Sequence, residues 1–99
     1  RVLFRSFVVD SLNNIKGISC LSPEGAFYVF PNCKKLLNKK TKLKTDKDFV
    51  EKLLEKAEVA VVQGSAFGLD GYFRISYATS MENLKKAMQR IKNFCDSLN

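Results

Sequence analysis

The sequence of 99 residues contains no histidine and no tryptophan, and it has only two prolines and three cysteines. Without histidine, the chain cannot form a Ser-His or Cys-His catalytic pair, and a four-ligand zinc site of cysteine and histidine cannot be assembled. Cys20, Cys33 and Cys95 form no Cys-x-x-Cys pair, and their odd number favours reduced thiols over a disulfide framework. These absences exclude the common metal and nucleophile sites and predict a cytoplasmic protein.

Long apolar runs are also missing. The apolar run of residues 59–62 is far too short to cross a bilayer, and Arg5 interrupts the apolar start of the chain, which therefore lacks a signal-peptide pattern. We expect no membrane span and no membrane partner. A hydrophobic fraction of 45% and a charged fraction of 27% are typical of a globular chain, so residues 1–99 are predicted to form one small domain.

The net charge of +7 is concentrated in one segment. Seven lysines lie between Lys34 and Lys47, and Asp46 is the only acid among them. The segment is either a basic module that binds nucleic acid or a solvated loop that lysine keeps soluble. It contains no arginine and no aromatic residue, the types that bind phosphates in a fork and stack on bases. We therefore favour the loop and expect no nucleic-acid partner.

Strands and helices alternate along the sequence. The predicted strands are residues 18–21, 26–30, 59–62 and 72–78. One helix is predicted from the N-cap Thr45 to about Ala57, and a second follows the cap Ser80. The first segment fits a strand by propensity and a helix by the spacing of its apolar residues, so both remain open. This order predicts an α+β domain whose small sheet of about four strands is covered by helices mainly on one face.

Arg74 is the only charged residue between Asp70 and Glu82, and it lies in the middle of the predicted strand 72–78. Alternation gives this strand two faces, with Tyr72, Arg74 and Ser76 on one and Phe73, Ile75 and Tyr77 on the other. The planar guanidinium can bind a carboxylate through two parallel hydrogen bonds. The residues alone favour a structural ion pair or an exposed position, and they leave a binding role open.

Four segments of the chain carry recognisable motifs, and they are Pro23-Glu24-Gly25-Ala26-Phe27-Tyr28-Val29-Phe30-Pro31, Val59-Ala60-Val61-Val62 with Gly64-Ser65-Ala66-Phe67-Gly68, Phe73-Arg74-Ile75-Ser76-Tyr77-Ala78-Thr79-Ser80, and Asn83-Leu84-Lys85-Lys86-Ala87. In order and spacing they resemble class I aminotransferases, the pyridoxal-phosphate enzymes that include aspartate aminotransferase. The resemblance covers essentially the whole chain. One departure is Gln63, where the family often has proline.

The resemblance implies that residues 1–99 are the C-terminal small domain of such an enzyme, and that the large cofactor-binding domain precedes Arg1. It also implies that Arg74 binds the α-carboxylate of the amino-acid substrate. Phe27 either fills the core or, as the resemblance implies, lines the active site together with Gly25, which would let the backbone come close to another segment. The glycine-rich loop that starts at Gly64 lacks the following helix and the Lys-Ser/Thr pair of a phosphate-binding loop, which favours a plain connection between strands.

The parent enzyme implied by the resemblance transfers an amino group between aspartate, or a related amino acid, and 2-oxoglutarate. Its pyridoxal 5'-phosphate would be bound mainly by the large domain, and the parent would be a homodimer. No lysine here resembles the Schiff-base motif, so the chain alone is expected to be inactive and to lack catalytic and cofactor-binding residues. An aromatic, prephenate or alanine-type specificity stays open, and so do the alternatives of a nucleic-acid-binding module and of a fragment that only packs against a partner.

Overall fold

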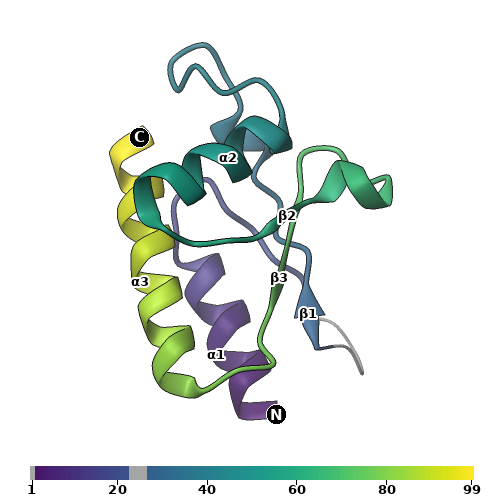
Figure 1. Ribbon diagram of the computed structural model, residues 1–99, viewed down its shortest axis with the longest axis vertical. Helices are drawn as coiled ribbons and strands as arrows, with labels where there is room; N and C mark the ends of the chain where they lie inside the picture. Colours follow the sequence, from purple (N-terminus) through teal and green to yellow (C-terminus); the bar gives the residue numbers. More distant parts are fainter. Residues whose placement is uncertain (1, 23–26) are drawn as a thin grey trace.

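The computed structural model describes residues 2–22 and 27–99 (Figure 1). It contains three α-helices, α1 (Val2–Asn13), α2 (Asp46–Ala57) and α3 (Met81–Leu98), and three strands, β1 (Tyr28–Val29), β2 (Val62–Gln63) and β3 (Phe73–Ser76). Two short 3₁₀ helices, η1 (Lys34–Leu36) and η2 (Gly64–Phe67), lie in the connections. The α+β class expected from the sequence is confirmed, and the first segment is a helix.

The described sheet has three strands rather than about four. β3 lies in the centre and pairs antiparallel with β1 and with β2, so the order is β1-β3-β2. The predicted strand 18–21 contributes only a single bridge, between Ser19 and Asn32. The next residue, Cys20, cannot extend a ladder because the Asn13 side chain binds both its N–H and its C=O, each at 2.8 Å.

Strand bounds also differ from the prediction at β2. We predicted a buried strand over residues 59–62, but β2 begins at Val62 and both of its residues are half-buried. The register pairs Val62 with Arg74 and Gln63 with Phe73, so the bounds of β2 are set by the residues of β3 with which it pairs. Because strand pairing depends on a distant segment, local propensity alone placed this strand too early.

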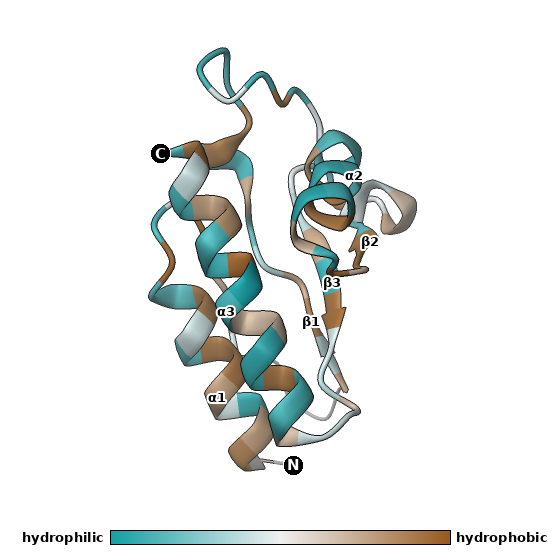
Figure 2. Cartoon of the chain, turned by 60° about the vertical axis from the view of Figure 1, so that its left-hand side comes forward, coloured by the Kyte–Doolittle hydropathy of each residue, from teal (hydrophilic) through white to brown (hydrophobic). Residues whose placement is uncertain are grey.

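The helices begin where their caps predict. The Thr45 hydroxyl accepts a hydrogen bond from the Asp48 N–H at 3.2 Å, and the Asp48 side chain accepts one from the Thr45 N–H at 3.3 Å, which completes a capping box. Ser80 caps α3 by accepting from the Asn83 N–H at 3.1 Å. α1 and α3 lie side by side, each with hydrophobic and hydrophilic stripes (Figure 2). Among the described residues, no helix has the length and apolar character that crossing a bilayer requires.

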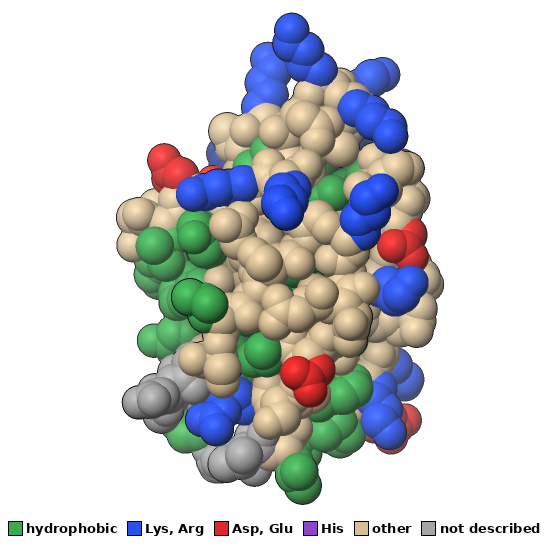
Figure 3. Space-filling view, turned by 180° about the vertical axis from the view of Figure 1, so that it is seen from behind, with side chains coloured by type: hydrophobic (Ala, Val, Ile, Leu, Met, Phe, Trp, Pro, Cys, Tyr) green, Lys and Arg blue, Asp and Glu red, His purple; other side chains and the backbone are tan. Residues whose placement is uncertain are grey.

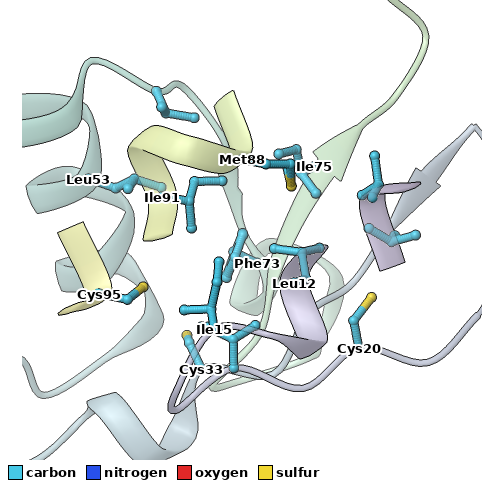
Figure 4. Close-up of a cluster of buried hydrophobic side chains, with 14 of the residues drawn as sticks. Leu12, Ile15, Cys20, Cys33, Leu53, Phe73, Ile75, Met88, Ile91 and Cys95 are labelled. Carbon is cyan, nitrogen blue, oxygen red and sulfur yellow. The ribbon is translucent and has the colours of Figure 1, made fainter. Parts of the chain in front are cut away.

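The core lies between the helices and one face of the sheet. Phe49 of α2 stacks on Phe73 of β3 with ring centroids 5.2 Å apart, and it meets Phe94 of α3 edge-on at 5.6 Å. Figure 4 shows Phe73 and Ile75 pointing into the cluster that Leu12, Met88 and Ile91 complete. Since alternate residues of β3 point into this core, the residues between them point to the opposite face of the sheet.

Candidate functional site

Arg74 lies on the open face of the sheet, in its central strand. Burial along β3 alternates as predicted: Phe73 and Ile75 are buried, Arg74 is half-buried and Ser76 is exposed. β1 and β2 pair with β3 on either side, so the backbone at this position is held from both sides. A side chain rooted in such a strand has a fixed starting point and direction, which is what a precise binding group needs.

Aromatic rings flank the guanidinium. Its Cζ atom lies 4.8 Å from the ring centroid of Phe67 and 5.2 Å from that of Tyr28. Phe30 lies beside both rings, in edge contacts of 5.7 Å with each. We call Tyr28, Phe30 and Phe67 the aromatic frame. Cations within about 6 Å of a ring centroid are attracted by the ring quadrupole, so the frame holds the guanidinium while Tyr28 and Phe67 stay 41% and 47% exposed.

No structural ion pair of the described residues uses Arg74. The salt bridges there join side chains within α2 or within α3, such as Lys52 with Glu55 and Lys92 with Asp96. Among the described residues the ion-pair interpretation thus finds no partner for Arg74, and the alternative of a position on an exposed sheet face stays open. The aromatic frame has no anionic group, and a guanidinium in such a setting has the N–H donors that two parallel hydrogen bonds to a carboxylate require.

Asp46 supports the loop that carries Phe67. Within the described part of the chain it is the one buried charged residue, with 3% of its surface exposed. Its carboxylate accepts hydrogen bonds from the N–H of Ser65 at 2.8 Å and from the N–H of Gly71 at 3.3 Å. Burial raises the pKa of this carboxyl, whereas the hydrogen bonds from Ser65 and Gly71 lower it. Together the hydrogen bonds outweigh burial, so the pKa lies below its ordinary value. Asp46 is thus held as an anion that joins both ends of the loop.

Gly64 starts this loop at a point of close backbone approach. Its N–H donates to the Tyr72 C=O at 2.7 Å, and its C=O accepts from the Leu69 N–H at 2.9 Å. A Cβ atom at this position would lie 2.3 Å from the Leu69 oxygen and 2.7 Å from the Tyr72 oxygen. The loop is therefore a connection between strands, as predicted, and only glycine fits at its entry.

Phe27 lies apart from Arg74. It is 49% exposed, so it does not fill the core, and it lines a shallow hollow with Phe4, Tyr77, Ala78 and Thr79. Its carbonyl oxygen accepts from the Tyr77 N–H at 3.0 Å, which ties this segment to the end of β3. Gly25, the other residue predicted near an active site, lies outside the described residues.

The lysines all lie on the surface. Every lysine of the chain is exposed, and the basic segment from Lys34 to Lys47 gathers blue side chains at one end of the molecule (Figure 3). Lys34 contacts a ring, with its Nζ 5.1 Å from the Tyr72 centroid. A lysine that forms a Schiff base needs a desolvated setting that lowers its pKa. The residues of this chain therefore do not by themselves fit pyridoxal phosphate.

The sequence predicts Arg74 but not the residues around it. Tyr28 and Phe67 stand out there only as parts of motifs, and Asp46 only as the one acid of the basic segment. Tyr28 and Phe30 alternate with the buried Val29, so their shared face with Arg74 was a usable signal. The contact of Asp46 with residues 19 and 25 positions later had no signal in the sequence.

Comparisons with known proteins give consistent matches. A family model described as "Aminotransferase class I and II" matches residues 4–91. A probable aspartate/prephenate aminotransferase of Rhizobium leguminosarum bv. phaseoli is 57% identical in an alignment of length 95 that covers 92% of this chain and 24% of that protein. An aspartate aminotransferase of Rhizobium meliloti (strain 1021) is 55% identical over 98 residues, 95% of this chain and 24% of that protein.

Solved structures agree with the sequence matches. The crystal structure of the aspartate aminotransferase from Rhizobium meliloti aligns with a TM-score of 0.92 and 54% identity, over 96% of this chain and 25% of that one. An alanine aminotransferase from Pyrococcus furiosus aligns with a TM-score of 0.88 and 37% identity, over 97% of this chain and 24% of that one. The chain thus spans about a quarter of the length of the relatives it matches.

Proposed function

Since the chain belongs to the class I and II aminotransferase family, we propose that it is the C-terminal small domain of an amino-acid aminotransferase in which Arg74 binds the α-carboxylate of the substrate. The observation that carries the proposal is the setting of this arginine. It is rooted in the central strand, flanked by Tyr28 and Phe67, and engaged by no carboxylate of the described residues.

The geometry suits one end of an amino acid. Two parallel N–H donors of Arg74 would meet the two oxygens of the α-carboxylate, which fixes the orientation of the substrate as well as its position. The rings cover part of the guanidinium and the large domain of the proposed enzyme would cover the rest, so this ion pair would be stronger there than in water. Fixing the carboxylate on a rigid strand restricts the motion of the bond to be broken, and such positioning can contribute several kcal/mol to a lower barrier.

The cofactor belongs to the remainder of the proposed enzyme. When bound, pyridoxal phosphate would supply the electron sink that amino-group transfer requires. Because the lysines of this chain are all exposed, the lysine that joins the cofactor is proposed to lie in the large domain. This chain would contribute the carboxylate-binding half of the pocket, and alone it would be inactive.

Aspartate, or a related amino acid, is the proposed amino donor and 2-oxoglutarate the acceptor. The first relatives carry the names aspartate and aspartate/prephenate aminotransferase, and more distant structures are an alanine and an aromatic aminotransferase. Arg74 would serve any of these substrates, since all share the α-carboxylate. We further propose a homodimeric, cytoplasmic parent. Because each named relative is an aminotransferase, the nucleic-acid-binding module is not favoured.

Arg74→Lys in the intact enzyme tests the proposal. Lysine keeps the charge and loses the planar fork, so a dry carboxylate would lose a charged hydrogen-bond partner. Such a loss costs roughly 2–5 kcal/mol, or about 30- to several-thousand-fold in kcat/KM. Arg90→Lys, on the exposed surface of α3, is the matched control and should stay near wild type.

The defect should appear with every amino-acid substrate, while the absorbance of the bound cofactor and its affinity should change little. Normal kcat/KM for aspartate in Arg74→Lys, or a loss explained by release of the cofactor, would contradict the assigned role. In that case the search for the carboxylate-binding group would move to residues outside this chain.

A further inference from the structure

We propose that Asp46 is a positioning residue for Arg74: it fixes the loop of residues 64–71 so that Phe67 covers the guanidinium. The inference about the loop and the ring stands on the contacts of the described residues. Its consequence for substrate binding rests on the proposed function of Arg74.

Helix capping does not explain why Asp46 is buried. The first turn of α2 is capped by Thr45 and Asp48, which exchange hydrogen bonds at 3.2 and 3.3 Å. The Asp48 carboxylate also accepts from the Lys44 N–H at 3.0 Å. Asp46 instead directs its carboxylate to the loop, although a buried carboxylate is costly unless its partners are well placed. Its two partners must therefore be what keeps it there.

The two partners lie at opposite ends of the same loop. Ser65 is the second residue of η2, and Gly71 comes just before the residues that lead into β3. One oxygen of Asp46 accepts from Ser65 and the other from Gly71, so a single side chain holds both ends together. Charged hydrogen bonds of this kind are about twice as strong as neutral ones. Removing the carboxylate breaks both of these bonds at once, while the backbone bonds of Gly64 with Tyr72 and Leu69 remain.

Phe67 depends on this loop for its position. Its side chain is 47% exposed, so packing in the core does not hold it. Its ring contacts are with Arg74 at 4.8 Å and with Phe30 at 5.7 Å, both on the open face of the sheet. The place of the ring is thus decided by the backbone of η2, and the backbone of η2 is fixed by Asp46. A chain of contacts leads from the start of α2 to the guanidinium.

The geometric step is tested in the 99-residue chain by NMR. A ring 4.8 Å from the guanidinium shifts the resonances of the Arg74 side chain, and Phe67→Leu measures the size of that ring effect. Asp46→Asn should reproduce most of the shift change seen in Phe67→Leu. Asp48→Asn, two residues away and engaged only in capping, should leave the Arg74 resonances nearly unchanged.

A second substitution at Asp46 keeps the test decisive if the first variant fails to fold. Asp46→Ser suits the first turn of a helix and is the second variant if Asp46→Asn unfolds. Wild-type Arg74 shifts in a folded Asp46 variant would overturn the proposal, because the ring would then be placed without the carboxylate. Changes of equal size in Asp46→Asn and Asp48→Asn would also overturn it, since they would point to a general loosening of α2.

The consequence for binding is tested in the intact enzyme by a double-mutant cycle. Loss of one cation–π cover should lower kcat/KM by about 2- to 30-fold, mainly through KM, in both Asp46→Asn and Phe67→Leu. If Asp46 acts through Phe67, the double variant should be no worse than Phe67→Leu alone. Additive losses would overturn the proposed path.

The two proposals fail in different ways. If Arg74 does not bind the carboxylate, the NMR shifts would still follow Asp46, but Arg74→Lys and Phe67→Leu would keep normal kcat/KM. If Asp46 does not position the ring, Arg74→Lys would still be severely impaired while the Arg74 shifts in Asp46→Asn match the wild type.

Discussion

Replacing Gly64 by alanine should break the loop beneath Phe67. The new Cβ would lie 2.3 Å from the Leu69 oxygen and 2.7 Å from the Tyr72 oxygen, whereas real Cβ contacts stay above 3.0 Å. Both obstacles are backbone atoms, so no side-chain rotation relieves them. The loop would have to open by roughly 1 Å, and well-packed backbone does not yield that distance without losing hydrogen bonds.

Two hydrogen bonds lie directly in the path of this movement. The Gly64 N–H donates to Tyr72 at 2.7 Å, and the Gly64 C=O accepts from Leu69 at 2.9 Å. A backbone group left buried without a partner costs about 1–3 kcal/mol, so the two bonds together give about 2–6 kcal/mol. That is a large part of the roughly 5–15 kcal/mol that stabilises a small domain. With an m value of about 1–1.5 kcal/mol per M, the urea midpoint should fall by at least about 1.3 M.

Gly68→Ala is the matched control in the same loop. Gly68 has a φ of 77°, and a Cβ there would meet no atom within 4 Å. The substitution therefore costs only the left-handed conformation, about 1–2 kcal/mol. Urea unfolding followed by circular dichroism should rank Gly64→Ala clearly below Gly68→Ala. Equal midpoints for the two variants would refute the argument, because the cost would then come from conformation alone and not from the close approach.

Three further predictions concern the interior. The pKa of Asp46 lies below its ordinary value of 3.8, since its hydrogen bonds outweigh the burial that raises it. Its contribution to stability is therefore present above pH 3.8 and is lost as the pH falls through the pKa of the folded state. The urea midpoint of the wild type should drop between about pH 5 and pH 2.5, and that of Asp46→Asn should drop less. Phe49→Ala, at a fully buried ring, should cost about 3–5 kcal/mol in urea unfolding, whereas Leu54→Ala, 54% exposed on the same helix, should cost well under about 2 kcal/mol. Burial raises the pKa of the Cys33 and Cys95 thiols to about 12, so iodoacetamide at about pH 8 should modify them slowly in the folded chain and rapidly in urea; rapid labelling without denaturant would contradict their burial.

The helices α2 and α3 could be predicted from the sequence because their signals are local, whereas α1 stayed open between helix and strand. Thr45 and Ser80 are capping residues with their partners three positions later, and the apolar stripe of α3 repeats at helical spacing. The strands were harder. β1 and β2 have two residues each, and the central strand decides where they begin and end. Strand propensity placed β1, β2 and β3 in approximately the right segments. It also predicted a strand at residues 18–21, where the Asn13 side chain instead forms hydrogen bonds with the N–H and C=O of Cys20.

The residues of the candidate site also differ in how well the sequence predicts their positions. The position of Arg74 on the open face follows from alternation within one strand, which the sequence displays. Its surroundings come from three separate segments: Tyr28 from β1, Phe67 from η2 and, behind the loop, Asp46 from α2. Contacts between such distant segments depend on the path of the chain in space, and a single sequence contains no direct signal for them.

The central place of β3 sets an order of events while the chain is being made. β1 and β2 do not pair with each other, and each has β3 as its neighbour in the sheet. A ribosome adds about 5–20 residues per second, so Val29 waits several seconds after its own synthesis before Ile75, its partner, emerges. During that interval β1 has no partner strand, and of the helices only α1 and α2, which precede β3 in the chain, are available to cover its apolar side. The described sheet can form only after β3 has been made, and α3 then follows directly to close the core.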